Sequence, residues 1–221
     1  MTADMTLNAP AKTHHENHGM TPNDFRSQVE GGWENVYTPV RERMDLLLTS
    51  NKPVIFKGTG CVRRSKIGWL FAHGARLLGA PLVWKQDENV KTTVTVAKTD
   101  NNLRCWHRLF IFPSGYEQLV QTSKVMDAKL GFIDAVGARG EKRLATKMRV
   151  WAKDQSLFFE SKTYILRFKH FNLQIPGFLT PGTLFAEHRD LGEGNFRYTL
   201  EFNHPFWGQT FYQDGIFKMV T

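Results

Sequence analysis

The sequence predicts a mainly β protein of the α+β class, in which an antiparallel sheet curls into a lipocalin-like barrel with one or two flanking helices. Aromatic residues make up 13% of the 221 residues and include 17 Phe, and such side chains favour the pleated surface of a sheet. Runs of alternating polarity follow one another after Pro81, which is typical of strands. Short polar turns join these runs in place of helices, so we expect antiparallel neighbours.

The predicted strands continue almost to the end of the chain. Their ranges are 90–96, 103–112, 117–125, 131–136, 143–153, 157–169, 184–190, 196–203 and 209–217. So many neighbouring strands favour a closed or strongly curled sheet over a flat one. One strand is clearly one-sided, since Phe196, Tyr198, Leu200 and Phe202 alternate with polar residues. We therefore expect these four side chains to face the interior.

Two helices are predicted before the first of these strands. Over residues 35–50, Val40, Met44 and Leu47 recur at helical spacing, with charged residues on the other faces. Over residues 66–78, Leu70 and Leu77 belong to a second apolar stripe. For this stripe we prefer packing against the core to docking on a membrane surface.

The domain boundaries and the location follow from the composition. Residues 1–22 are polar and show no periodicity, so they are predicted to form a disordered tail in front of a single β-rich domain, residues 23–221. The start of the chain lacks the basic and apolar regions of a secretory signal, and no run of about 18 apolar residues predicts a membrane span. With two cysteines, Cys61 and Cys105, and no metal-ligand spacing, we expect a reducing, cytoplasmic location.

The protein is basic, with a formal net charge of +8, which attracts anions of several kinds. Lys147 and Arg149 illustrate how the cations fall on the polar face of a predicted strand. Few stacking aromatic residues share that face, so we expect a solubilising surface and no nucleic-acid partner. Contact with a membrane surface stays open as a prediction.

The motifs of common enzymes and metal sites are missing. The sequence has no phosphate-binding loop, no CxxC pair and no nucleophile elbow, and the glycines at 58 and 60 lack the rest of a dinucleotide fingerprint. A cluster of His14, His15 and His18 invites a metal interpretation, but its spacing is one residue shorter than the zincin motif needs. We therefore predict neither a metal nor a cofactor.

Arg108 is the most informative single residue. It shares the predicted inner face of its strand with Trp106 and Phe110. A guanidinium among large aromatics either reaches water, pairs with an acid or binds an anionic ligand. If its face points inward, a lone charge would cost several kcal/mol or more, which leaves the acid and the ligand. Glu187, with Glu201 as an alternative, is the preferred candidate for an internal ion pair, and a ligand carboxylate or phosphate is the other interpretation.

These residues belong to a series of short motifs that resembles an uncharacterised family. The motifs comprise Trp106, Arg108, Phe110, Ser123, Pro176, Leu179, Pro181, Glu187, Pro205, Gly208, Tyr212 and Gly215. They look like a domain of unknown function that is often the C-terminal partner of a saccharopine-dehydrogenase-like reductase domain. The resemblance covers about residues 53–217, and no reductase half is present here. It implies a module that assists an enzyme acting on an apolar or lipid-like substrate, with a separate reductase as a partner, and it transfers no catalytic residue.

The leading functional hypothesis is a non-enzymatic binding domain that holds a small apolar or lipid-like ligand with an acidic head group inside the barrel. The predicted ligand-binding residues are Trp106, Arg108, Phe110, Ser123, Glu187, Tyr198, Phe202 and Tyr212. One alternative is a small isomerase or hydrolase that uses a histidine with Glu187 or Glu201 in the cavity. Another is an accessory module that docks on a reductase.

Overall fold

The computed structural model describes residues 18–19, 21–77, 82–99, 103–136, 144–168 and 171–220. Most of these residues form long strands. The strands of the barrel wall are β3 (Val54–Arg64), β4 (Asp87–Lys98), β5 (Arg104–Ile111), β6 (Glu117–Asp127), β7 (Gly131–Val136), β8 (Leu144–Lys153), β9 (Ser156–Arg167), β11 (Thr183–Gly192), β12 (Asn195–His204) and β13 (Gly208–Val220). Three short strands are attached to the wall: β1 (His18–Gly19) on β6, β2 (Val29–Glu30) on β8 and β10 (Asn172–Gln174) on β9.

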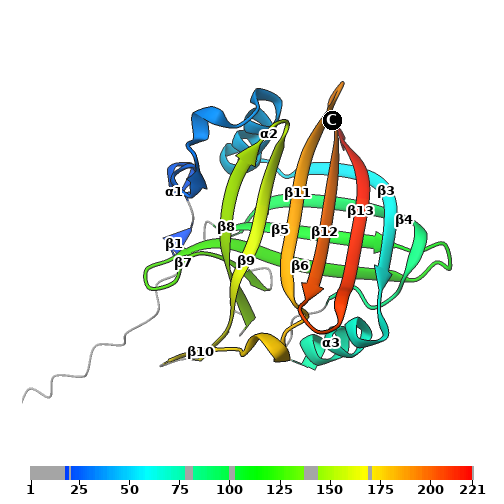
Figure 1. Cartoon of the computed structure of the whole chain (residues 1–221). Coiled ribbons are helices and arrows are strands. Elements are labelled where there is room, and N and C mark those ends of the chain that lie inside the picture. Colours follow the sequence, from blue (N-terminus) through cyan, green and yellow to red (C-terminus); the bar gives the residue numbers. More distant parts are fainter. Residues whose placement is uncertain are drawn as a thin grey trace, which may run out of the picture.

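The ten wall strands close into a barrel within the described residues (Figure 1). Their order is β9-β11-β12-β13-β3-β4-β5-β6-β7-β8, and the pairing of β8 with β9 completes the ring. All neighbours in the ring are antiparallel. The predicted mainly β, lipocalin-like barrel is therefore confirmed.

One wall strand, β3, was not predicted from the sequence. Gly58 and Gly60 interrupt its apolar pattern. In the structure they allow β3 to approach β13 closely, because a Cβ atom at Gly60 would lie 1.8 Å from the carbonyl oxygen of Asp214. Because glycine has no side chain, the alternating pattern that predicts a strand is weakest where the backbones of β3 and β13 approach closely.

The helices are α1 (Pro22–Ser27), α2 (Thr38–Thr49) and α3 (Lys66–Leu77), with short 3₁₀ turns η1 (Trp33–Asn35) and η2 (Gly177–Leu179). The helix α2 confirms the first predicted helix and covers one end of the barrel, at the top of Figure 1. Its Met44 and Leu47 project into the barrel interior. Most of the predicted tail, residues 1–22, lies outside the described residues, but its end pairs with β6 as β1, and Thr21 caps α1.

Buried polar contacts hold α2 in place. The guanidinium of Arg104 on β5 donates to the carbonyl oxygens of Leu48 (2.8 Å) and Ser50 (2.5 Å) at the C-terminal end of the helix. A cation is favourable there because of the helix dipole and the unpaired carbonyls. Arg43 of α2 also forms a buried 2.7 Å ion pair with Asp190 of β11. The helix is thus a fixed plug at this end of the barrel.

The helix α3 lies at the opposite end, and its orientation corrects the sequence-based interpretation. Its small residues Gly68 and Ala72 are the buried ones, whereas Leu70 is 57% and Leu77 is 90% exposed. The expectation that the apolar stripe packs on the core is therefore wrong. Gly68 explains the orientation, because any side chain there would overlap the backbone carbonyl of Thr210; only the small-residue face of α3 can approach β13.

The plug contact of Arg104 is testable by substitution. Arg104→Met should lower the free energy of unfolding by about 2–3 kcal/mol, because it leaves buried carbonyl groups of α2 without a charged donor. Urea unfolding followed by circular dichroism measures this change. Arg189→Met, at an exposed position on β11, is the control and should change stability by less than about 0.5 kcal/mol. Equal effects of both substitutions would contradict the role of Arg104.

Candidate binding cavity

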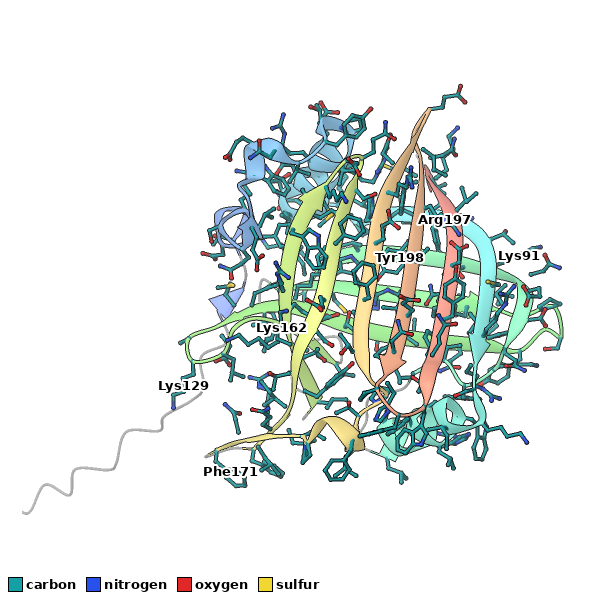
Figure 2. All side chains as sticks on the ribbon, in the orientation of Figure 1. Lys91, Lys129, Lys162, Phe171, Arg197 and Tyr198 are labelled. Carbon is teal, nitrogen blue, oxygen red and sulfur yellow. The ribbon has the colours of Figure 1, made fainter. Side chains whose placement is uncertain are left out.

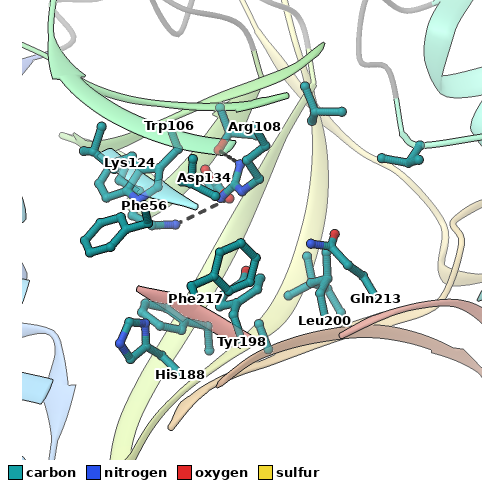
Figure 3. A pocket seen from close by; sticks show the side chains of 18 of the residues that line it. Phe56, Trp106, Arg108, Lys124, Asp134, His188, Tyr198, Leu200, Gln213 and Phe217 are labelled. Carbon is teal, nitrogen blue, oxygen red and sulfur yellow. Dashed lines mark hydrogen bonds and ion pairs between the residues drawn. The ribbon is translucent and has the colours of Figure 1, made fainter. Parts of the chain in front are cut away.

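A cavity of about 160 Å³ lies inside the barrel. Its walls come from two buried apolar clusters, one that includes residues of α2 and one toward the α3 end that contains Phe110, Phe202 and Phe211. Polar and charged residues also contribute to the described lining. They are Arg108, Thr122, Lys124, Asp134, His188, Tyr198 and Gln213 (Figure 3).

Three charged side chains lie in the lining because three neighbouring strands turn the faces that carry them toward the interior. Arg108 is on β5, Lys124 is on β6 and Asp134 is on β7, where Asp134 is the direct partner of Lys124 in the antiparallel register. The Lys124 ammonium lies 3.5 Å from Oδ2 of Asp134, and Arg108 donates to the Thr122 hydroxyl at 3.1 Å. Burial raises the pKa of the Tyr198 phenol on β12, and the charge of Arg108 opposes this change.

Lys124 is buried against rings. Its Nζ lies 5.1 Å from the ring centroid of Trp106 and 5.3 Å from that of Phe159, within the range of cation–π attraction. Burial lowers the pKa of this ammonium, the carboxylate of Asp134 opposes that change, and the charge of Arg108 adds to it. Oδ1 of Asp134 is buried and has no hydrogen-bond partner in the described structure. It is therefore an acceptor that a donor on a ligand could satisfy.

Arg108 does not form the predicted ion pair. Glu187 accepts a 2.6 Å hydrogen bond from the hydroxyl of Ser156, and it points away from the cavity because its neighbours Ala186 and His188 line the cavity. Glu201 is also absent from the described lining and accepts a hydrogen bond from the Gln209 side chain. The internal Arg108–Glu187 bridge is thus wrong, and no described carboxylate forms an ion pair with Arg108. With Lys124 and Asp134, the lining carries one net positive charge.

The structure brings five of the eight predicted ligand-binding residues together. Trp106, Arg108, Phe110, Tyr198 and Phe202 all line the cavity. The other three do not. Besides Glu187, these are Ser123, which is buried opposite Cys105 on the other face of β6, and Tyr212, whose neighbours Phe211 and Gln213 point inward in its place.

The sequence reasoning missed two charged residues of the lining, Lys124 and Asp134. Asp134 did carry a signal, because it is the lone acid in the otherwise apolar strand GFIDAV. Lys124 carried no sequence signal of burial, since a lysine at the end of a strand is usually solvated. Their proximity required the register between β6 and β7, which the sequence alone does not contain.

His188 belongs to the α2 plug as well as to the lining. Its Nε2 lies 3.0 Å from Nη1 of Arg43, and its ring stacks on Phe196 with 4.3 Å between centroids. Burial lowers the pKa of His188 to about 3, with a further lowering by Arg43 that Asp190 opposes. The ring is therefore neutral near pH 7. His188 is the only histidine and Asp134 the only carboxylate of the described lining, so the predicted His–Glu pair of an isomerase or hydrolase is not assembled there.

The described residues offer neither a metal site nor a membrane-spanning helix. They contain no group of three or more potential ligands that could hold a metal ion. The three N-terminal histidines considered above, His14, His15 and His18, lie outside the residues whose side chains the structure describes. No described helix has the length and apolar character needed to cross a bilayer.

Comparison with known families adds one finding. The family model described as "Domain of unknown function (DUF4166)" matches residues 37–217. The chain belongs to this family. The match extends the resemblance seen in the sequence toward the N-terminus, so the DUF4166 domain includes the plug helix α2 as well as the barrel up to Phe217 in β13. No curated protein and no solved structure matches the chain.

The unpaired state of Arg108 has a consequence for stability. Arg108→Met should not lower the free energy of unfolding by more than about 1 kcal/mol, because no carboxylate is left stranded by the substitution. Urea unfolding of the purified domain is the measurement. Asp190→Ala is the contrasting variant: it leaves the buried Arg43 unpaired and should cost about 3–5 kcal/mol. A loss of that size in Arg108→Met would show a hidden acid partner.

The pKa of His188 predicts how stability depends on pH. The pKa of about 3 in the folded protein lies below the ordinary value of 6.5, so the unfolded chain takes up a proton first as the pH falls. This contribution to stability is complete above pH 6.5 and is lost progressively toward pH 3. Between pH 7.5 and 5, the difference amounts to about 2 kcal/mol. In His188→Gln, the free energy of unfolding measured in urea should fall less between pH 7.5 and pH 5 than in the unchanged protein. An identical fall in both proteins would assign the effect to another group.

Proposed function

We propose that this DUF4166 domain is a binding domain for a compact apolar molecule with an acidic head group. The observation that carries the proposal is Arg108, a cation that faces an apolar cavity without a carboxylate partner among the described residues. Lys124 adds a second cation, and Asp134 balances one of the two. An anionic head group restores neutrality in a space where an uncompensated charge is costly.

The geometry suggests how such a ligand is held. The acidic head lies against Arg108, with the Thr122 and Tyr198 hydroxyls beside it, and the apolar body packs among Trp106 and Phe110. A few convergent polar groups within an apolar wall are typical of small-molecule sites. The unpartnered Oδ1 of Asp134 favours a ligand that also carries a donor, such as a hydroxyl group.

The size of the cavity limits the ligand. A volume of about 160 Å³ is similar to that of an engineered apolar cavity of about 150 Å³ that binds benzene. A ring-sized or short branched acid therefore fits without rearrangement, whereas a long-chain fatty acid must displace side chains of the lining. We expect affinity to fall as the apolar body grows beyond this size.

The cellular setting is also part of the proposal. Cys61 and Cys105 are not joined in a disulfide, and we propose a reducing, cytoplasmic location. The resemblance noted in the sequence suggests a saccharopine-dehydrogenase-like reductase as the protein that uses the bound molecule. Pull-down of the tagged domain followed by mass spectrometry tests for such a partner.

A ligand series tests the binding proposal. Titration calorimetry with benzoate, octanoate and palmitate should show the tightest binding for the smaller acids, and benzamide should bind at least about tenfold more weakly than benzoate because it has no charge for Arg108. Arg108→Met should remove this preference for the acid, and Arg189→Met is the matched surface control. Equal binding of benzoate and benzamide, or binding of neither, would contradict the proposal. Extraction of natively purified protein for mass spectrometry would identify a ligand that copurifies.

A further inference from the structure

The end of the barrel at α3 carries an unusual concentration of exposed apolar side chains. Nine of the sixteen large apolar side chains exposed in the described residues lie in three short segments: residues 66–77, 171–182 and 204–210. The most exposed are Leu70 (57%), Leu77 (90%), Phe171 (57%), Phe178 (58%), Leu179 (58%) and Phe206 (77%). Scattered apolar residues are ordinary on a protein surface, but a contiguous group marks an interaction site. We call these three segments the α3-end surface.

The three segments meet in space. The ring of Phe71 on α3 lies 5.7 Å from that of Trp207 in the turn between β12 and β13. Thr210, just after this turn, donates through its hydroxyl to the carbonyl oxygen of Pro181, which follows η2. Figure 1 shows α3 and the segment of β10 at the same end of the barrel, opposite α2, and Figure 2 shows Phe171 projecting from that edge.

The helix α3 turns its large apolar side chains away from the protein, an orientation that suits an apolar environment outside it. Surface helices of globular proteins bury their large apolar residues and expose polar ones. In α3 the buried residues are Gly68 and Ala72, while Trp69, Leu70 and Leu77 are exposed. A side chain at position 68 would overlap the Thr210 carbonyl, so the absence of one lets this face of α3 pack closely on β13.

The charges of the α3-end surface indicate which kind of partner it binds. Its three segments contain no Asp or Glu, and their Lys66 and Arg76 are both exposed. The guanidinium of Arg76 lies 5.1 Å from the ring centroid of Trp84, so a cation and an aromatic ring occur together. Aromatic and leucine side chains with flanking cations and no acids are typical of elements that enter the interface of an anionic bilayer.

We propose that the α3-end surface docks the domain on an anionic phospholipid bilayer. Leu70, Phe178 and Phe206 enter the boundary between head groups and acyl chains, and Lys66 and Arg76 bind lipid phosphates. Cavity residues Leu82, Val83 and Phe202 belong to the apolar cluster nearest this end, so a docked barrel presents the α3 end of its cavity to the lipid. The docking depends on surface residues alone and is independent of the ligand proposed above.

Vesicle sedimentation tests the docking. The full chain should bind vesicles of equal parts phosphatidylcholine and phosphatidylglycerol more tightly than pure phosphatidylcholine vesicles, and high salt should reduce this preference. The double variant Leu70→Ser/Phe206→Ser should lower the partition coefficient by about tenfold or more. The matched control is Leu119→Ser/Ile216→Ser, at comparably exposed apolar positions on the barrel wall (46% and 53%), which should bind like the unchanged protein. Lys66→Gln/Arg76→Gln should lose roughly tenfold on the anionic vesicles only.

Several outcomes would overturn the proposal. Equal loss of vesicle binding in the two serine pairs would show that the α3-end surface has no special role, and absence of binding to either vesicle type would exclude docking. Analytical ultracentrifugation of the same variants tests the remaining alternative, which is self-association of the chain through this surface. A dimer abolished by Leu70→Ser/Phe206→Ser, without vesicle binding, would assign the surface to a second copy of the chain. Circular dichroism of each variant confirms that it is folded.

Discussion

The pairing of β8 with β9 is the contact on which the interior of this protein depends, because it joins the two ends of a ten-strand sheet. Closure removes the sheet edges and separates the inward side chains from bulk water. A guanidinium such as that of Arg108 would be readily hydrated on an open sheet. Inside the ring it keeps a hydroxyl contact and access to the cavity but no carboxylate partner. The electrostatic character of the site is therefore a consequence of the topology.

The two ends of the barrel differ in how they are closed. At one end, α2 is held by charged groups that bind its carbonyls and its Arg43, and the neutral His188 completes this contact. At the other end, α3 approaches through Gly68, and its large side chains remain outside. One end is thus closed by a helix that buried charged contacts hold in place, whereas the other end leaves large apolar side chains exposed.

Strand alternation carried most of the correct predictions. It placed Trp106, Arg108 and Phe110 on one face and Tyr198 and Phe202 on one face, and the structure turns both faces into the cavity. Alternation states which residues share a face, but it does not state which face is inside when both contain large apolar groups. Glu187 shares its face with Phe185, and that face is the outer one, where Phe185 packs near other rings. The predicted ion pair failed for this reason.

The sequence alone determined the mainly β fold class, the helix α2 and the aromatic, cationic character of the interior, because these depend on periodicities and compositions that are local along the chain. Only the tertiary structure decided which charges meet. Lys124 and Asp134 become neighbours through the register of β6 on β7, and the apolar stripe of α3 becomes an outer surface through the backbone of a strand far away in the sequence. Both depend on contacts between distant segments, whose geometry no local pattern contains.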